Sequence, residues 1–280
     1  MKTVAYKSEN LLRLGLREYA GFGMDETQMA IREFGIERYT NGASGSVIDY
    51  VVAEEPLEVR LDGHPVAVLM RTPGFDTDLV TGFLVTEGIL KSPAQVRKVE
   101  ADGNRILVFL NDGERVDLGK FTRNMYAGSS CGICGKATLD AIFLEFPKLE
   151  TKRMPSSEIL LSAPAELRSR QENFSATGGL HAAGLFGFDG ELLALREDIG
   201  RHNAVDKVIG HALGEGIPTS DCWLLVSGRV SFEIMQKALA VGIPCVAAIS
   251  APSSLAVDFA KGSGQALVGF LRFPGFNRYA

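Results

Sequence analysis

The chain has 280 residues and is poor in the features that mark secreted and membrane proteins. It has only four cysteines, and in a chain of this length they do not make a disulfide framework. It has no stretch of about 18 consecutive apolar residues, so we expect no membrane-spanning helix. Residues 1–7 contain no apolar signal region, and the cytosol is the expected compartment.

A strong excess of charge of one sign is also lacking. The chain has 29 basic and 34 acidic residues, and its net charge of -5 gives no basic footprint for nucleic acid. Apolar residues make up 46% of the chain, which is enough to bury a full core. For a chain of this length we expect two lobes.

Two of the four cysteines stand together in a glycine-flanked Cys-x-x-Cys motif, Cys131-Gly132-Ile133-Cys134-Gly135. Residues 136–146 carry apolar side chains at helical spacing, which predicts that the motif lies at a helix N-terminus. Unpaired backbone amides at such a position favour a thiolate and lower the pKa of a cysteine. The motif therefore indicates sulfur chemistry, metal binding or both.

Three interpretations of this motif stay open from its own residues. A structural zinc site needs four ligands, and the chain has no second such motif to supply the other half. A thioredoxin-like dithiol usually follows the first strand of a small domain, whereas this motif lies in mid-chain. The third interpretation is sulfur transfer through a persulfide. Cys222 and Cys245 stand alone in apolar runs and are expected to be small buried hydrophobic residues.

We expect a weakly ordered lead-in over residues 1–45 and a β-rich lobe over residues 46–128. Glycines interrupt the lead-in without clear periodicity, whereas alternation of apolar and polar residues predicts strands further on. Asp62-Gly63 predicts a hairpin turn, and Asp76 or Thr77 is the expected cap of a helix. The expected strands are 48–52, 57–61, 65–70, 105–110 and 114–118 in a mainly antiparallel sheet, and the expected helix is 76–90.

Residues 129–280 are expected to form a three-layer α/β lobe that carries the Cys-x-x-Cys motif at its start, so that the whole chain is α/β, or α+β overall. Continuous apolar strands alternate here with helices, a pattern typical of a parallel sheet buried on both faces. Ligands of such sheets bind at the carboxyl ends of strands. The expected strands are 184–188, 191–195, 222–226, 246–249 and 266–271, and the expected helices are 231–241 and 254–261.

Two predicted strand ends carry polar turns that suit an anion. Residues 227–231 read Ser-Gly-Arg-Val-Ser and residues 250–254 read Ser-Ala-Pro-Ser-Ser, so each turn offers hydroxyls and the amides of a helix N-terminus. Ordinary helix capping is the plainer alternative for either turn alone. Two such turns at neighbouring strand ends, with Arg229 in one of them, favour an anionic ligand.

The densest polar cluster covers residues 196–207. His202 and Asp206 are four residues apart, and Asn203 is three and four residues before Asp206 and Lys207, so these side chains can meet on one helical surface. A solvated helix start is the alternative. The cluster either positions a ligand or organises the interface between the lobes.

Histidines outside this cluster are given no role. His181 follows the flexible turn Thr177-Gly178-Gly179. A lone histidine is more often structural than catalytic, so His64 and His211 are not assigned either.

The ordered set of motifs resembles the FdhD family of formate dehydrogenase accessory sulfurtransferases, over about residues 49–270. The matching segments are 55–57 (Glu-Pro-Leu), 82–88 (Gly-Phe-Leu-Val-Thr-Glu-Gly), 131–135 (Cys-Gly-Ile-Cys-Gly), 177–181 (Thr-Gly-Gly-Leu-His), 197–207, 227–229 (Ser-Gly-Arg) and 250–252 (Ser-Ala-Pro).

The resemblance implies a cytosolic sulfurtransferase. Such a protein takes persulfide sulfur from a cysteine desulfurase and passes it to the molybdenum cofactor before the cofactor enters formate dehydrogenase. By motif position Cys131 is the implied persulfide cysteine and Cys134 its assisting or relay partner. The implied fold of the second lobe is cytidine-deaminase-like, although no His-x-Glu precedes a Pro-Cys-x-x-Cys here, so zinc-activated water has no ligands.

The resemblance further implies binding of the molybdenum bis-molybdopterin guanine dinucleotide cofactor as substrate, with no resident metal. Formate dehydrogenase, a cysteine desulfurase and a second copy of the chain are the implied partners, without nucleic acid or membrane. A dithiol oxidoreductase and a noncatalytic zinc-dependent binding protein remain the alternatives. The expected cofactor-binding residues are Phe270, Leu271, Arg272, Phe273, Pro274 and Gly275 near the C-terminus, together with Ser227, Gly228, Arg229, Ser250 and His202.

Overall fold

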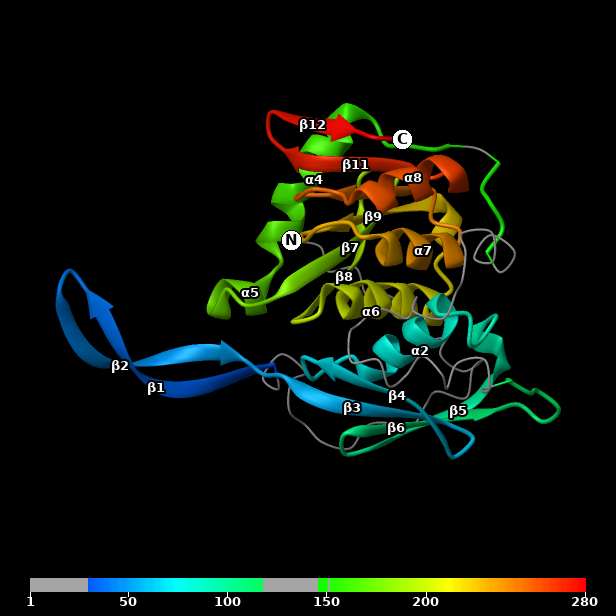
Figure 1. Ribbon diagram of the computed structural model, residues 1–280, viewed down its shortest axis with the longest axis horizontal. Coiled ribbons are helices and arrows are strands. Elements are labelled where there is room, and N and C mark those ends of the chain that lie inside the picture. The colour runs from blue at the N-terminus through cyan, green and yellow to red at the C-terminus, as the bar shows by residue number, and fades with distance from the viewer. Residues whose placement is uncertain (1–29, 118–145, 151) are drawn as a thin grey trace, which may run out of the picture.

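The computed structural model describes residues 30–117, 146–150 and 152–280, which form two stacked lobes and a projecting hairpin (Figure 1). None of the described helices is both long and apolar enough to cross a membrane. The strands are β1 (Ile31–Thr40), β2 (Ala43–Val52), β3 (Glu55–Leu61), β4 (His64–Arg71), β5 (Val96–Asp102), β6 (Arg105–Leu110), β7 (His181–Gly187), β8 (Leu192–Asp198), β9 (Cys222–Val226), β10 (Cys245–Ala248), β11 (Ala266–Arg272) and β12 (Gly275–Arg278). The helices are α2 (Asp76–Thr86), α4 (Ser157–Ser169), α5 (Glu172–Thr177), α6 (Arg201–Gly214), α7 (Phe232–Ala240) and α8 (Ser254–Ser263).

The first lobe is a four-stranded sheet in the order β4-β3-β6-β5, with α2 packed on one face. Its β3–β4 hairpin turns through Asp62 and Gly63, both with positive φ, which confirms the hairpin expected at this Asp-Gly pair. Leu57 and Val59 of β3 are fully buried and belong to the same core as Leu79 of α2. All pairs in this sheet are antiparallel except β3 with β6, which is parallel.

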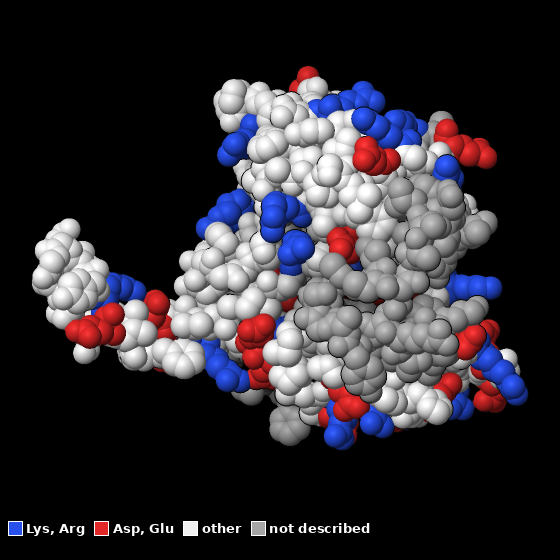
Figure 2. Space-filling model, viewed as in Figure 1, with Lys and Arg blue, Asp and Glu red and all other residues white. Residues whose placement is uncertain are grey.

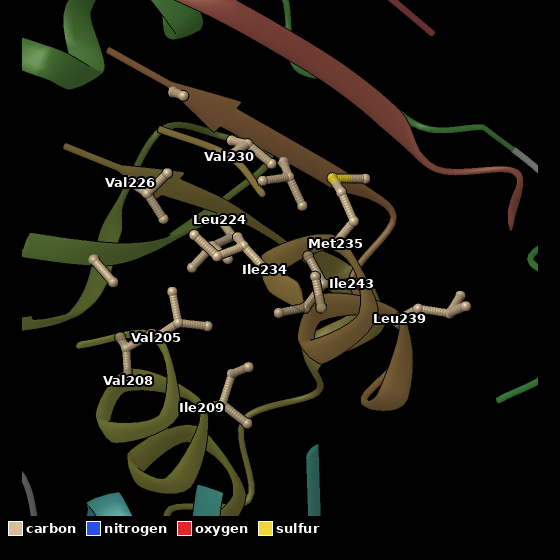
Figure 3. Packing of buried hydrophobic residues seen from close by; sticks show 14 of the residues in the cluster. Val205, Val208, Ile209, Leu224, Val226, Val230, Ile234, Met235, Leu239 and Ile243 are labelled. Carbon is tan, nitrogen blue, oxygen red and sulfur yellow. The ribbon is translucent and has the colours of Figure 1, made fainter. Parts of the chain in front are cut away.

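The second lobe is a six-stranded sheet in the order β12-β11-β10-β9-β7-β8, covered on both faces. Strands β9, β10 and β11 are parallel, as their unbroken apolar sequences predict. Alternate residues of β9 point to opposite faces of the sheet. Leu224 and Val226 pack with α6 and α7 (Figure 3) and with α8 on one face, while Trp223 and Leu225 pack with α4 on the other. The lobe is therefore a three-layer α/β structure, and its resemblance to cytidine deaminases stays a prediction.

The lobes meet where α2 crosses α6 with the two backbones in contact. A Cβ atom on Gly82 would lie 1.9 Å from the carbonyl oxygen of Asp206, and one on Gly210 would lie 1.9 Å from that of Asp78. Only glycine fits at these two positions, because an added Cβ atom would clash with backbone atoms of the facing helix, which cannot rotate away as a side chain can. The close crossing fixes α6 against the first lobe.

Several boundaries differ from the sequence prediction. Residues 31–45, expected to be part of a weakly ordered lead-in, form β1, its turn and the start of β2, so the prediction is wrong for them. Residues 114–117 are not a strand, and the antiparallel partner of β6 is β5 instead. Helix α2 ends at Thr86 rather than at residue 90, and its N-cap residue is Phe75, with no side-chain cap. Asp76 bonds to Arg71 through both carboxylate oxygens and is therefore not a cap.

Candidate functional site

The carboxyl ends of β9, β10 and β11 meet at one edge of the large sheet, beside the start of the antiparallel β7. We call this region the carboxyl edge, and it consists of residues 181, 201, 227–231, 250–253 and 270–275. The amide of Phe270 donates to the carbonyl of Ser250 over 3.0 Å, and the amide of Val230 donates to that of Ala251 over 3.2 Å. These bonds join the two polar turns to each other and to the C-terminal segment.

The first polar turn is bound tightly to β7. The Ser227 amide donates to the carbonyl of Ala182, and the Ser227 hydroxyl accepts from the amide of Ala182, both over 2.9 Å. A Cβ atom on Gly228 would lie 3.1 Å from Nδ1 of His181, so the turn backbone lies against this imidazole. Arg229 is exposed beyond it. The turn therefore presents the Arg229 side chain from a backbone held in place by β7.

The two turns differ in how their serines are used. Ser253 caps α8, since its hydroxyl accepts from the amide of Ala256 over 3.2 Å, so capping explains the second turn. Ser231 precedes α7 but makes no such cap. Its hydroxyl lies 3.1 Å from Nε2 of His202 instead, and that imidazole is only 8% exposed. His202, an expected cofactor residue, is thus buried beneath the edge and links α6 to α7.

The C-terminal segment is a hairpin between β11 and β12 whose side chains mostly face outward. Phe270 is in the left-handed region, with φ of 53°, and its side chain is 37% exposed. An aromatic residue there is strained, and such strain persists only where the surrounding structure fixes the backbone. Leu271 is fully buried, whereas Phe273 is 84% exposed. Arg272, Pro274 and Gly275 are exposed as well.

The polar cluster at residues 196–207 organises the interface between the lobes. Asp198 is fully buried and pairs with Lys207 at 2.8 Å, and it also accepts from the amides of Thr72 and Gly200. The Lys207 ammonium donates in turn to the carbonyl of Thr72 over 2.8 Å. Of the side chains expected to meet on one helical surface, Asn203 and Lys207 both bond to Asp198, whereas Asp206 bonds to Thr86 and Lys237.

A second buried group completes this interface. Lys237 of α7 lies 2.9 Å from a carboxylate oxygen of Asp206 and 2.7 Å from one of Glu87, and it donates to the Thr86 hydroxyl over 3.0 Å. Burial alone lowers the pKa of Lys237, but the charges of Asp206 and Glu87 outweigh it and raise the pKa above its usual value. We call Thr86, Glu87, Asp198, Asp206, Lys207 and Lys237 the interface cluster.

Two further residues of the carboxyl edge, His181 and Arg201, were not predicted from the sequence. Burial lowers the pKa of His181, and the neighbouring guanidinium groups of Arg201 and Arg229 lower it further. Arg201 starts α6, and its Nε atom is buried without a hydrogen-bond partner in the described part of the chain. The sequence shows that His181 follows the Thr177-Gly178-Gly179 turn. Its contacts with residues 201 and 228 depend on the order of the strands in the sheet, which the local sequence does not specify.

The four cysteines divide into two kinds. Cys131 and Cys134 lie outside the described residues. Cys222 and Cys245 are buried in the large sheet, which confirms them as small apolar residues. Burial raises the pKa of Cys222 to about 11 and that of Cys245 to about 12, so neither is a thiolate at neutral pH. In residues 30–117, 146–150 and 152–280, no three His, Cys, Asp or Glu side chains are grouped to hold a metal ion.

Known proteins of one family are similar to this chain over most of its length. Residues 52–280 match the model of the FdhD/NarQ family. The sulfur carrier protein FdhD of Streptomyces coelicolor is 49% identical over 87% of this chain and 91% of its own length. That of Sulfolobus acidocaldarius is 43% identical over 90% and 97%, respectively. A crystal structure of a candidate formate dehydrogenase accessory protein from Desulfotalea psychrophila is similar, with a TM-score of 0.72 and 25% identity, covering 89% of this chain and 96% of that one. The chain belongs to the FdhD/NarQ family.

Proposed function

We propose that this chain is a sulfurtransferase that carries persulfide sulfur on Cys131 to the molybdenum bis-molybdopterin guanine dinucleotide cofactor, for the maturation of formate dehydrogenase. The proposal rests on the names of its relatives, which are sulfur carrier and formate dehydrogenase accessory proteins. The structural observation that carries it is the carboxyl edge, where two turns, Arg229 and an exposed Phe270 meet. Such an edge suits a dinucleotide with phosphate groups.

Sulfur loading is a thiol exchange on Cys131. Its thiolate attacks the outer sulfur of a persulfide on the cysteine desulfurase, the sulfur–sulfur bond of that persulfide breaks, and the desulfurase cysteine leaves as a thiolate. Release of the outer sulfur as sulfide needs two electrons. The Cys134 thiolate supplies them by attacking Cys131 Sγ, which leaves a disulfide between the two residues. A dithiol reductant then restores both thiols.

The cofactor is the substrate of the second step and is held at the carboxyl edge. Arg229 is exposed and pairs with no carboxylate in the described part of the chain, so it is free to bind a phosphate. The amides at the start of α7 have no side-chain cap and add donors on the same side. Phe270 and Phe273 offer exposed aromatic faces on which a guanine base can stack.

We further propose that the chain acts in the cytosol as a homodimer. A reducing compartment keeps both thiols of the motif available. The β1–β2 hairpin projects from the body of the molecule (Figure 1), and a two-stranded hairpin has little stability of its own. Contact with a second copy would cover its apolar side chains. The large apolar side chains exposed on it are Phe34, Tyr39, Ile48, Tyr50 and Val51.

Intact-mass spectrometry tests the carrier role. The full chain is incubated with a cysteine desulfurase and free cysteine, and Cys131→Ala and Cys134→Ala are treated in parallel. We expect the wild type to gain the mass of one sulfur atom, reversibly with reductant. Cys131→Ala should not gain it, whereas Cys134→Ala should gain the sulfur and retain it. The same samples under native conditions report whether one or two copies are present.

The rival functions give different masses. A dithiol oxidoreductase would lose the mass of two hydrogens on oxidation to a disulfide and would gain no sulfur. A zinc-dependent binding protein would carry stoichiometric metal and unfold on chelation. A gain of sulfur that persists in Cys131→Ala would overturn the assignment of the persulfide to this cysteine.

A further inference from the structure

The carboxyl edge holds cations that have no counterion among the described residues. Neither Arg201 nor Arg229 forms an ion pair within the residues the structure describes. Figure 2 shows Lys and Arg side chains on the left of the upper lobe, above the base of the projecting hairpin. Cations that remain unpaired at the end of a parallel sheet favour an anionic ligand.

Arg201 is the more informative of the two arginines. Its Nε atom is buried and has no hydrogen-bond partner among residues 30–117, 146–150 and 152–280, although a buried guanidinium donor without a partner is costly. Arg201 also lies in the first turn of α6, whose N-cap residue, Gly200, has no side chain to accept from the helix amides. An oxyanion at this place would accept from the side chain and from the helix amides together.

His181 and Gly228 bring the two arginines to one place. A Cβ atom on Gly228 would lie 3.1 Å from Nδ1 of His181 and 3.8 Å from Cβ of Arg201, so the turn that carries Arg229 lies directly against both side chains. The four residues come from β7, α6 and the turn after β9. Their contact is therefore a product of the sheet order rather than of one local motif.

His181 adds a donor without adding charge. Burial lowers the pKa of His181, the charges of Arg201 and Arg229 lower it further, and Asp198 partly opposes them. At neutral pH its imidazole is thus neutral and can donate one hydrogen bond. An anion bound between the arginines would offset their charge and raise the pKa of His181, which gives a measurable sign of binding.

We propose that Arg201 and His181, together with Arg229, bind the phosphate groups of a diphosphate ester. Two guanidinium groups match the charge of a diphosphate, and the planar guanidinium can donate two parallel hydrogen bonds to phosphate oxygens. This inference rests on the proposed function, because it names the residues that hold the diphosphate of the dinucleotide cofactor. It assigns roles to Arg201 and His181, which motif reasoning leaves without one.

Calorimetric titration of the full chain with inorganic pyrophosphate tests the proposal, with inorganic phosphate and guanosine 5′-diphosphate as further arms. We expect saturable binding of pyrophosphate, weaker binding of phosphate, and about tenfold weaker pyrophosphate binding in Arg201→Gln. Arg201→Lys keeps the charge and should recover part of the loss. The matched control is Arg153→Gln, since Arg153 pairs with Asp221 at the opposite end of β9 and should not affect binding.

A second measurement keeps structural damage apart from lost binding. The pKa of His181, followed by NMR, should rise on addition of pyrophosphate in the wild type and not in Arg201→Gln. Unchanged pyrophosphate affinity in Arg201→Gln, or no binding by the wild type, overturns the inference. Sulfur loading of Cys131, measured by mass on the same variants, should be normal in all of them. Its absence from the wild type would instead overturn the proposed function.

Discussion

At the interface between the lobes, Lys207 and Lys237 each lie within 2.9 Å of a carboxylate oxygen, whereas at the carboxyl edge Arg201 and Arg229 pair with no carboxylate in the described structure. The same stretch of chain supplies both regions. Asp198 and Lys207 turn toward the first lobe, while Arg201 lies between them in sequence and turns toward the strand ends. The paired, buried charges hold the two lobes together, whereas the unpaired guanidinium groups of Arg201 and Arg229 are available to bind a ligand.

The difference has an energetic basis. A buried ion pair is weak evidence for net stability, because desolvation offsets most of the attraction, but loss of one partner leaves an uncompensated charge. The interface cluster is thus sensitive to any change in its composition. The edge has the opposite property, because removal of an unpaired cation relieves repulsion between like charges and costs the fold little. Stability and ligand binding should therefore respond to different substitutions.

Lys237→Met should give the largest effect on stability. It leaves the buried carboxylate of Asp206 without its cation and removes one partner of the partly exposed Glu87, and we expect a loss of about 3 to 5 kcal/mol in the free energy of unfolding. Urea denaturation measures it. The control is Lys261→Met, an exposed lysine of α8, which should change stability by about 0.5 kcal/mol or less. Addition of Asp206→Asn to Lys237→Met should restore part of the loss. Equal stability of the two lysine variants would mean that the interface does not depend on its charges.

Gly82→Ala tests the packing of the interface separately from its charges. The added methyl group would lie 1.9 Å from the backbone oxygen of Asp206, so α2 and α6 must separate, and we expect a loss of about 3 kcal/mol. Gly214→Ala in α6 has open space around it and should instead stabilise the protein by about 0.5 to 1 kcal/mol. Urea denaturation of both variants gives the comparison. A stabilising Gly82→Ala would show that the helices can move apart freely.

The sequence predicted most of the second lobe because its strands are buried on both faces and its turns carry strong signals. The apolar run of β9 is an example from this lobe, and in the first lobe the Asp-Gly turn predicted its hairpin in the same way. It failed for β1, where eight of the ten residues are exposed to solvent, so no apolar alternation marks the strand. It also failed for β5, an edge strand whose charged residues hide the pattern in the same way.

The candidate site was predictable only where its residues are close in sequence. The turns at Ser227 and Ser250 follow strands directly, and the structure joins them as expected. His181 and Arg201 reach the same edge because β7 runs antiparallel beside β9, a pairing that no local pattern specifies. The i, i+4 spacing of His202 and Asp206 did not predict the ion pair of Asp206. Its partner is Lys237 of α7, which lies far from it in the sequence.

His202 lies between the two regions and gives the smallest of the expected effects. Burial lowers the pKa of His202 to about 4, and the charges of Arg201 and Lys237 contribute. The unfolded chain takes up a proton near pH 6.5 and the folded chain only near pH 4. The stability that this residue contributes is therefore complete above pH 6.5 and is lost as the pH falls toward 4, by about 2 to 3 kcal/mol in total.

Urea denaturation at pH 7 and pH 4.5 isolates this contribution when wild type and His202→Gln are compared. We expect the variant to lose about 2 kcal/mol less between the two pH values, because glutamine does not titrate. His64→Gln is the matched control, since His64 is exposed and should leave the pH dependence unchanged. If His202→Gln and the wild type lose the same stability on acidification, His202 is already accessible to protons in the folded state. It would then belong with the open carboxyl edge rather than with the buried interface.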